Sequence, residues 1–94
     1  MNAAVQVEAP TTAKDRLIAH RDTALDRLHR MPEGWTRDIL VMTAEIANRV
    51  GRHPANSEEE RTALAAAQAT AATVCARLLK TAETCANLEG IEPL

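Results

Sequence analysis

The sequence offers little material for a conventional hydrophobic core. Phe and Tyr are absent and Trp35 is the single aromatic residue, which argues against an aromatic platform that stacks nucleic-acid bases. Leu, Ile and Val together account for 18 of the 94 residues, close to the level of roughly 20 % below which disorder becomes common. The net charge of only −2 opposes disorder. We therefore expect a folded chain with a thin core, the kind of small domain that often gains stability by oligomerising.

Cysteine is also scarce, and the two residues present are not placed to bridge each other. Cys75 and Cys85 fall on one expected helix, where ten residues separate them by about 15 Å. A disulfide requires Cα atoms within about 7 Å. We expect two reduced, mostly buried thiols, with a bridge between two copies as the alternative. Without a disulfide framework, the reducing cytoplasm is the expected location.

Signals for secretion, membrane insertion and chemistry are missing. Residues 1–10 lack the basic start and apolar core of a secretion signal, and no apolar run approaches the roughly 18 residues of a membrane span. His20, His29 and His53 do not have metal-ligand spacing, and no nucleophile, base and orienting group can be assembled. We expect no catalytic residue, cofactor, metal ion or small-molecule ligand, and hence a protein that is not an enzyme.

The residues that are present predict an all-α protein. Residues 1–10 read as a flexible lead-in, and residues 11–94 as a single helical domain. The expected helices cover residues 12–30, 35–50 and 57–88. The strongest boundary signal is a capping box, in which Ser57 and Glu60 satisfy the first amides of the last helix. The fold class is therefore a short helical hairpin followed by one long C-terminal helix.

Apolar residues recur at helical spacing in both hairpin helices. In the first helix they share one arc: Leu17, Ala24, Leu25, Leu28 and Met31. In the second helix they form the row Trp35, Ile39, Met42, Ile46 and Val50, widened by Leu40 and Ala47. Trp35 has two interpretations: a core plug where the two helices turn, or an anchor in a protein interface, where Trp is enriched.

The long helix carries two heptad rows and very little charge. One row is Leu64, Ala71, Leu78 and Cys85, and the other is Ala67, Val74, Thr81 and Leu88. Four heptads of this kind suit a bundle or coiled-coil seam. The 15 positions between Arg61 and Arg77 hold no charged residue. A helix that is apolar on most sides is usually covered on more than one of them.

The lengths of the helices then predict self-association. The hairpin helices, about 28 and 22 Å long, cover only half of a helix of about 47 Å. We expect the hairpin to lie over the first half of the long helix, from Leu64 to Val74, and to leave the second half open. The expected protein interface is Val74, Leu78, Leu79, Cys85 and Leu88, together with Trp35. A homodimer that completes a helical bundle is the simplest closure, because two-fold dimers are the commonest oligomers.

Two features favour a nucleic-acid-binding regulator as the alternative. Residues 43–51, Thr-Ala-Glu-Ile-Ala-Asn-Arg-Val-Gly, followed by a turn, resemble the first half of a helix-turn-helix, which would extend over residues 43–64. The sequence departs from that motif where recognition would occur, because the following helix opens with three glutamates at residues 58–60. The second feature is a possible electrostatic docking stripe on the first helix: Arg16, His20, Arg27 and Arg30.

The function expected from these patterns is binding rather than catalysis. We interpret the chain as a small cytoplasmic protein of bacterial or phage type that binds a larger protein through helix–helix contacts. It would regulate or inhibit that target, in the manner of an anti-activator, adaptor or phage- or plasmid-borne inhibitor. The expected partners are a second copy and the target protein; contact with nucleic acid is expected only under the alternative, and contact with a membrane is not expected.

Overall fold

A computed structural model describes residues 12–91 as three α-helices, with no strand in that range. The helices are α1 (Ala13–Leu28), α2 (Trp35–Gly51) and α3 (Glu58–Leu88), so the all-α, three-helix prediction is confirmed. Each boundary lies within two residues of the expected range. The flexible lead-in predicted for residues 1–10 lies outside the described residues.

Side-chain caps fix the starts of α1 and α3. The Thr12 hydroxyl accepts a hydrogen bond from the Asp15 amide at 3.0 Å. At α3 the predicted capping box forms in a modified version, in which Glu60 bonds the amide of Asn56, the residue before the N-cap, and not the amide of Ser57. The Ser57 hydroxyl accepts from the Glu60 amide at 3.0 Å, and the Glu60 carboxylate accepts from the Asn56 amide at 2.7 Å. These bonds satisfy amides that the first turn of a helix leaves without partners.

The first turn of α2 takes its cap from the far end of the chain. Gly34 precedes α2 and supplies no side chain, and Glu89, just beyond α3, fills that role. Its carboxylate accepts from the Trp35 amide (3.0 Å), the Thr36 amide (3.0 Å) and the Thr36 hydroxyl (2.6 Å). A Cβ on Gly34 would overlap this carboxylate, and φ at Gly34 is +155°. The end of α3 is therefore tied to the start of α2.

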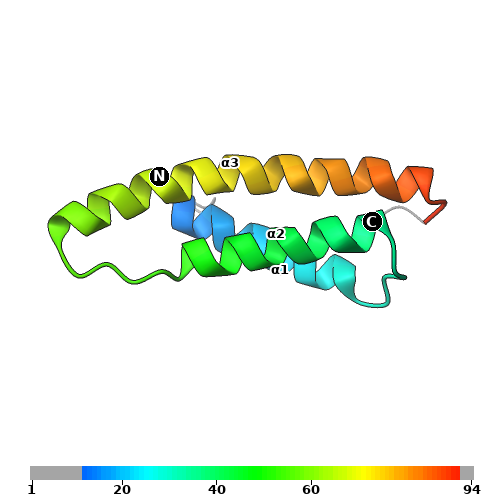
Figure 1. The fold of residues 1–94 in the computed structure, drawn as a ribbon, viewed down its shortest axis with the longest axis horizontal. Coiled ribbons are helices and arrows are strands. Elements are labelled where there is room, and N and C mark those ends of the chain that lie inside the picture. The colour runs from blue at the N-terminus through cyan, green and yellow to red at the C-terminus, as the bar shows by residue number, and fades with distance from the viewer. Residues whose placement is uncertain (1–11, 92–94) are drawn as a thin grey trace, which may run out of the picture.

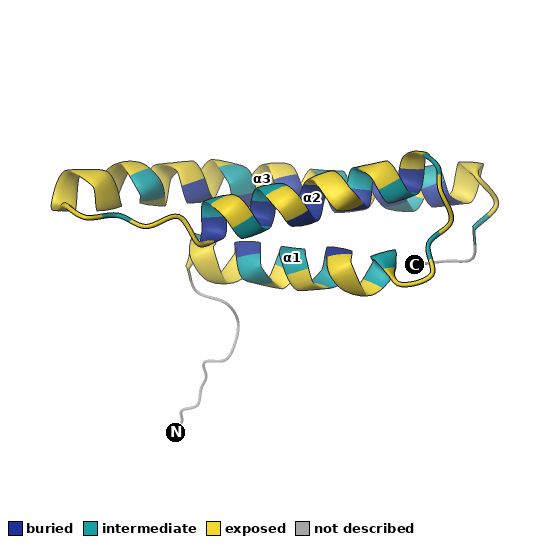
Figure 2. Cartoon of the chain, turned by 60° about the horizontal axis from the view of Figure 1, so that its bottom comes forward, coloured by how far each residue is buried: buried dark blue, intermediate teal, exposed yellow. Residues whose placement is uncertain are grey.

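The helices form one layered bundle in which α3 runs antiparallel to α2 (Figure 1). Three contacts set the register along this pair. Gln68 donates to the Val50 carbonyl at 3.2 Å, the Cys75 thiol lies 3.8 Å from the Thr43 carbonyl, and Glu89 caps α2. Beyond the Val50 contact, the first three turns of α3 extend past the hairpin (Figures 1 and 2). The radius of gyration, 15.3 Å, accordingly exceeds the roughly 12 Å of a compact chain of this length.

The prediction of which half of α3 the hairpin covers was wrong. The buried residues of α3 all lie between Gln68 and Ala86, whereas residues 58–67 are exposed apart from the half-buried Leu64. The cause is the connection of residues 52–57, which is not helical. Six extended residues span up to about 20 Å, so the chain moves outward from the end of α2 before α3 begins. We call residues 58–67 the overhang.

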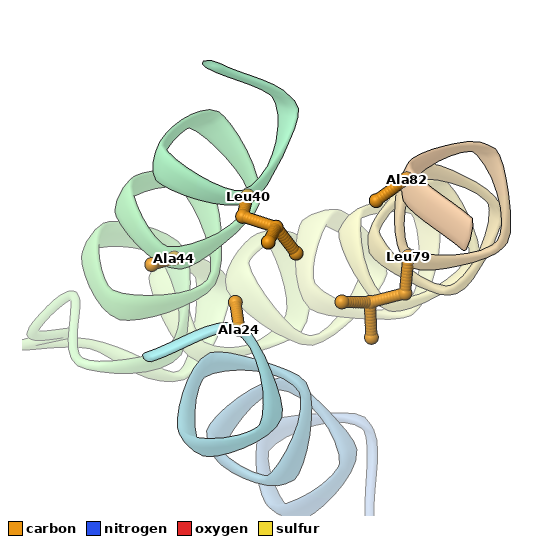
Figure 3. Close-up of a cluster of buried hydrophobic side chains, with 5 residues drawn as sticks. All are labelled: Ala24, Leu40, Ala44, Leu79 and Ala82. Atoms are coloured by element: carbon orange, nitrogen blue, oxygen red, sulfur yellow. The ribbon is translucent and has the colours of Figure 1, made fainter. Parts of the chain in front are cut away.

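The core is thin, as the composition implied, and consists of two clusters. One cluster joins all three helices through Ala24, Leu40, Ala44, Leu79 and Ala82 (Figure 3). The other contains Leu17, Ala47, Ala72 and Cys75. Leu79, predicted as an interface residue, is only 9 % exposed and belongs to this core. Small side chains dominate both clusters and let the helix backbones approach closely.

Candidate protein-docking surface

The buried row of α3 is neither of the two predicted heptad rows. It consists of Gln68, Ala72, Cys75, Leu79, Ala82 and Ala86, whose alternating spacing of four and three residues is itself a heptad pattern. One predicted row is half-buried and consists of Leu64, Ala71, Leu78 and Cys85. The other is exposed and consists of Ala67, Val74, Thr81 and Leu88. The inward row holds mostly small residues because they permit close packing, so most larger aliphatic residues lie outside it.

Helix α2 is likewise rotated about its own axis relative to the prediction, so that its buried row is not the predicted apolar row. Its buried residues are Thr36, Leu40, Thr43, Ala44, Ala47 and Gly51. The predicted apolar row is displaced, with Ile39, Ile46 and Val50 half-buried and Trp35 and Met42 exposed. Two threonines can be buried because their hydroxyls are bonded: Thr43 donates to the Ile39 carbonyl at 2.7 Å, and Thr36 donates to Glu89. Hydrophobicity alone therefore could not identify the inward face.

The displaced rows of α2 and α3 lie on one side of the molecule. Helix α1 contacts the opposite flank of each helix, through Arg21 and Asn48 on α2 (2.9 Å) and through Arg27 and Glu83 on α3 (3.6 Å). The two rows form a continuous apolar surface away from α1, which we call the α2/α3 face. Its members on α2 are Trp35, Ile39, Met42, Ile46 and Val50. Its members on α3 are Leu64, Ala67, Ala71, Val74, Leu78, Cys85 and Leu88.

At the overhang the α2/α3 face is hollowed into an open groove. The groove has a volume of about 610 Å³ and an apolar lining that includes Val50, Ala63, Leu64 and Ala67. Arg49 and Glu60 are among its polar members. An apolar floor with a charged rim is the usual composition of a protein-docking site.

Several large side chains of this face are well exposed. Leu88 is 72 % exposed, Trp35 63 % and Met42 48 %. The interpretation of Trp35 as a core plug is therefore wrong, and its position at the rim is compatible with the interface interpretation. Of the other predicted interface residues, Val74 is exposed, Leu78 and Cys85 are half-buried, and Leu79 lies in the core. Contiguous apolar exposure of this kind marks interaction sites.

The predicted basic stripe is not one free patch. Arg16 and Arg30 are exposed, but Arg27 is directed to Glu83, and its Nη1 atom is buried without a hydrogen-bond partner within residues 12–91. His20 is half-buried, and burial, reinforced by the Arg16 charge, lowers the pKa of its imidazole. The four residues therefore do not present four equivalent charges to a partner.

Residues 43–64 do not have the geometry of a helix-turn-helix. That motif joins helices at about 90–120° through a turn of three or four residues. Here six residues connect α2 to α3, and the two helices lie side by side in opposite directions (Figure 1). The segment that would read the major groove is instead the overhang, whose first turn carries the glutamates at residues 58–60.

The thiols and carboxylates of the described residues form no evident chemical site. Cys75 and Cys85 are both free, and burial raises the pKa of the Cys75 thiol, which lowers the fraction of reactive thiolate. Within residues 12–91, no group of three His, Cys, Asp or Glu side chains is placed to hold a metal ion.

By length and composition α3 could also cross a membrane. An 18-residue window of this helix has a mean hydropathy of 1.2, and 28 % of that window is buried. The sequence reasoning missed this window because Thr and Gln interrupt its apolar runs. A helix packed in a soluble bundle passes the same test, and the inward row of α3 contacts α1 and α2. The hydropathy of α3 is therefore only weak evidence for membrane insertion.

No protein-family model, curated protein or solved structure matches the chain.

Proposed function

We propose that the chain is a non-catalytic helical protein that binds a larger protein through its α2/α3 face and thereby regulates or inhibits it. The observation that carries this proposal is the apolar exposure along two adjacent helices, from Trp35 to Val50 and from Leu64 to Leu88. The apolar rows of α2 and α3 lie side by side with a groove between them at the overhang. This shape suits an amphipathic helix or a helical surface of a partner.

The surrounding chemistry supports binding rather than turnover. The open groove contains Arg49, His53 and Glu60, but no nucleophile accompanies them there. The target would contribute an apolar helix with few charges at its centre, because burying an unpaired charge on this face is costly. Self-association through the same face, as a helical-bundle dimer, and a cytoplasmic location that keeps both thiols reduced, belong to the same proposal.

A matched pair of variants tests whether this face selects a partner. Ala67 and Ala66 are adjacent, exposed and alike, but Ala67 lies on the α2/α3 face and Ala66 lies about 100° around the helix. Tagged wild type, Ala67→Glu and Ala66→Glu would be expressed in cells of the source organism, and bound proteins would be identified by mass spectrometry. We expect a protein captured by wild type and Ala66→Glu to be lost from Ala67→Glu.

Direct binding then completes the test. The captured protein, once purified, should blue-shift the emission of Trp35, the only tryptophan of the chain, and Ala67→Glu should weaken its binding at least tenfold. Circular dichroism of both variants establishes that they remain helical. Equal capture by the two glutamate variants, or the absence of any protein bound in stoichiometric amount, would contradict the proposal.

A further inference from the structure

We propose that, in the free protein, a second copy covers the α2/α3 face in an antiparallel two-fold dimer whose axis passes between Ala71 and Val74 of the two α3 helices. This inference deepens the proposed function, since it assigns the same face to self-contact until a target replaces it. The occupant of the face is a second copy of the chain, and the axis between Ala71 and Val74 defines a single register. Three observations support this arrangement.

The first observation is the size of the face. The stripe from Leu64 to Leu88 is about 36 Å long, the α2 row is about 22 Å long, and packed helices are 8–10 Å apart. The face therefore measures on the order of 600 Å² per copy, or about 1,200 Å² for a pair, which is the lower end of stable protein interfaces. One further helical surface of the same length would cover it, and the chain itself supplies such a surface.

The second observation is steric complementarity in a single register. Antiparallel overlap of two α3 helices to within one residue of their full length opposes residues whose numbers add to 145. Leu64 then faces Thr81 of the second copy, Ala67 faces Leu78, and Ala71 faces Val74. Each larger side chain meets a smaller one, which is how facing layers interdigitate. The groove beside Leu64 and Ala67 receives Leu78 of the second copy.

The third observation is the position of charge on the exposed part of α3. Glu60 lines the groove, and Arg77 is the only basic residue between Arg61 and Lys80. Parallel helices in register would oppose Glu60 to Glu60 and Arg77 to Arg77, and facing like charges destabilise a pairing. In the antiparallel register Glu60 faces Cys85, and Arg77 is level with the uncharged Gln68. The antiparallel orientation therefore removes both repulsions.

Cysteine cross-linking tests the register. In a Cys85→Ser background, Ala67→Cys and Leu78→Cys would be placed on separate molecules, one with a tag that changes its size, and the mixture would be oxidised. We expect a mixed disulfide dimer from the mixture and little product from either variant alone, because residues 67 of the two copies would lie about 16 Å apart. Ala66→Cys mixed with Leu78→Cys controls for random collision and should give little product.

Oligomeric state provides the second measurement. Light scattering coupled to size exclusion should give about twice the chain mass of 10.2 kDa for wild type and Ala66→Glu at high micromolar concentration. It should give the monomer mass for Ala67→Glu, whose helicity is checked by circular dichroism. In wild type, oxidation should not join Cys85 to Cys85, since about 37 Å separates them in this register.

The outcomes separate this inference from the proposed function. A wild-type monomer at high micromolar concentration, or single-cysteine variants that cross-link as well as the mixture, would overturn the antiparallel dimer. If such a monomer still captured a partner that Ala67→Glu lost, target binding through the α2/α3 face would stand and the self-association part of the proposed function would fail. If the dimer formed but no protein was captured, the dimer would stand and the proposed function would fail.

Discussion

The Glu89 carboxylate accepts three hydrogen bonds from the first turn of α2, so its charge stabilises the folded state. Chiefly through the bond from the Thr36 hydroxyl, these donors hold the pKa of Glu89 below its ordinary value of 4.5. A carboxyl with a lowered folded-state pKa contributes stability that is present above its unfolded pKa and is lost as the pH falls through the folded value. Stability should therefore decrease on acidification below pH 4.5.

Glu89→Gln tests this dependence. The variant should have a lower urea midpoint than wild type at neutral pH, and the difference should shrink as the pH falls from about 6 to 3, because protonation removes the charge from wild type as well. Urea titrations at several pH values would measure it. Glu33→Gln, at an exposed position in the α1–α2 connection, is the control and should follow the wild-type profile. A difference between Glu89→Gln and wild type that is independent of pH would contradict the charge-based cap.

Leu79 and Leu25 show how burial determines the contribution of a leucine to the free energy of unfolding. Leu79 is 9 % exposed and contacts α1 and α2 within the core, whereas Leu25 is 51 % exposed. Leu79→Ala should lower the free energy of unfolding by about 2–4 kcal/mol, because it removes buried methyl groups and leaves a cavity. Leu25→Ala should cost less than about 1 kcal/mol. Equal losses in urea titrations of the two variants would contradict the observed core.

At the scale of the helices, the overhang makes the two ends of α3 energetically different. Its capping box lies at Ser57 and Glu60, in the segment that extends past the hairpin. Removing a cap usually costs about 1 kcal/mol, but here we expect local fraying in place of global destabilisation. The cap of α1 at Thr12 lies about one helical turn before Leu17, a core residue, and should behave differently.

Ser57→Ala and Thr12→Ala form the corresponding comparison. Ser57→Ala should speed amide hydrogen exchange over residues 58–64 while changing the free energy of unfolding by less than about 0.5 kcal/mol. Thr12→Ala should lower that free energy by about 1 kcal/mol. Hydrogen exchange with mass spectrometry and urea titration measure the two effects. Global destabilisation by Ser57→Ala equal to that of Thr12→Ala would show that the overhang folds with the core.

The sequence predicted the helices well because their ends carry local signals. Thr12, Ser57 and Glu60 act within a few residues of themselves, and short-range chemistry is readable from one sequence. The inward faces were not readable in the same way. Thr36 can be buried because Glu89, 53 residues later, accepts a hydrogen bond from its hydroxyl, and Cys75 is buried because its size suits the close approach of α2 and α3. Which residues of a helix face the core therefore depends on the neighbouring helix and not on the local sequence alone.

At the scale of the whole molecule, the charge distribution opposes duplex DNA binding. The net charge is −2, Arg27 is directed to Glu83, and the exposed start of α3 carries three glutamates. Affinity for DNA comes mainly from neutralising phosphates with Lys and Arg. We expect no mobility shift of duplex DNA at micromolar protein and about 50 mM salt. A complex that weakens steeply with added salt would contradict this expectation and support DNA binding through the basic stripe of α1. Arg16→Glu would then test whether that stripe contacts the DNA.

The placement of the hairpin along α3 could not be predicted from helix lengths alone. Those lengths correctly implied that the hairpin leaves part of α3 uncovered. The direction of residues 52–57 and the hydrogen bond between Glu89 and Thr36 determine which part of α3 that is. The expected open surface, around Val74, Leu78 and Leu88, nevertheless borders solvent. It does so because α3 is rotated about its own axis relative to the predicted seam, and not because its second half lacks neighbours.

The overhang also gives this fold room to change length. An insertion of seven residues next to Ala63, with about three residues added to the connection of residues 52–57 so that it still reaches the start of α3, would extend α3 by about 10.5 Å and preserve the heptad phase. The core clusters, which begin at Ala72 on α3, would be untouched. Evolution or design could therefore enlarge the docking surface by whole heptads at one end, at little thermodynamic cost, while the bundle at the other end stays the same.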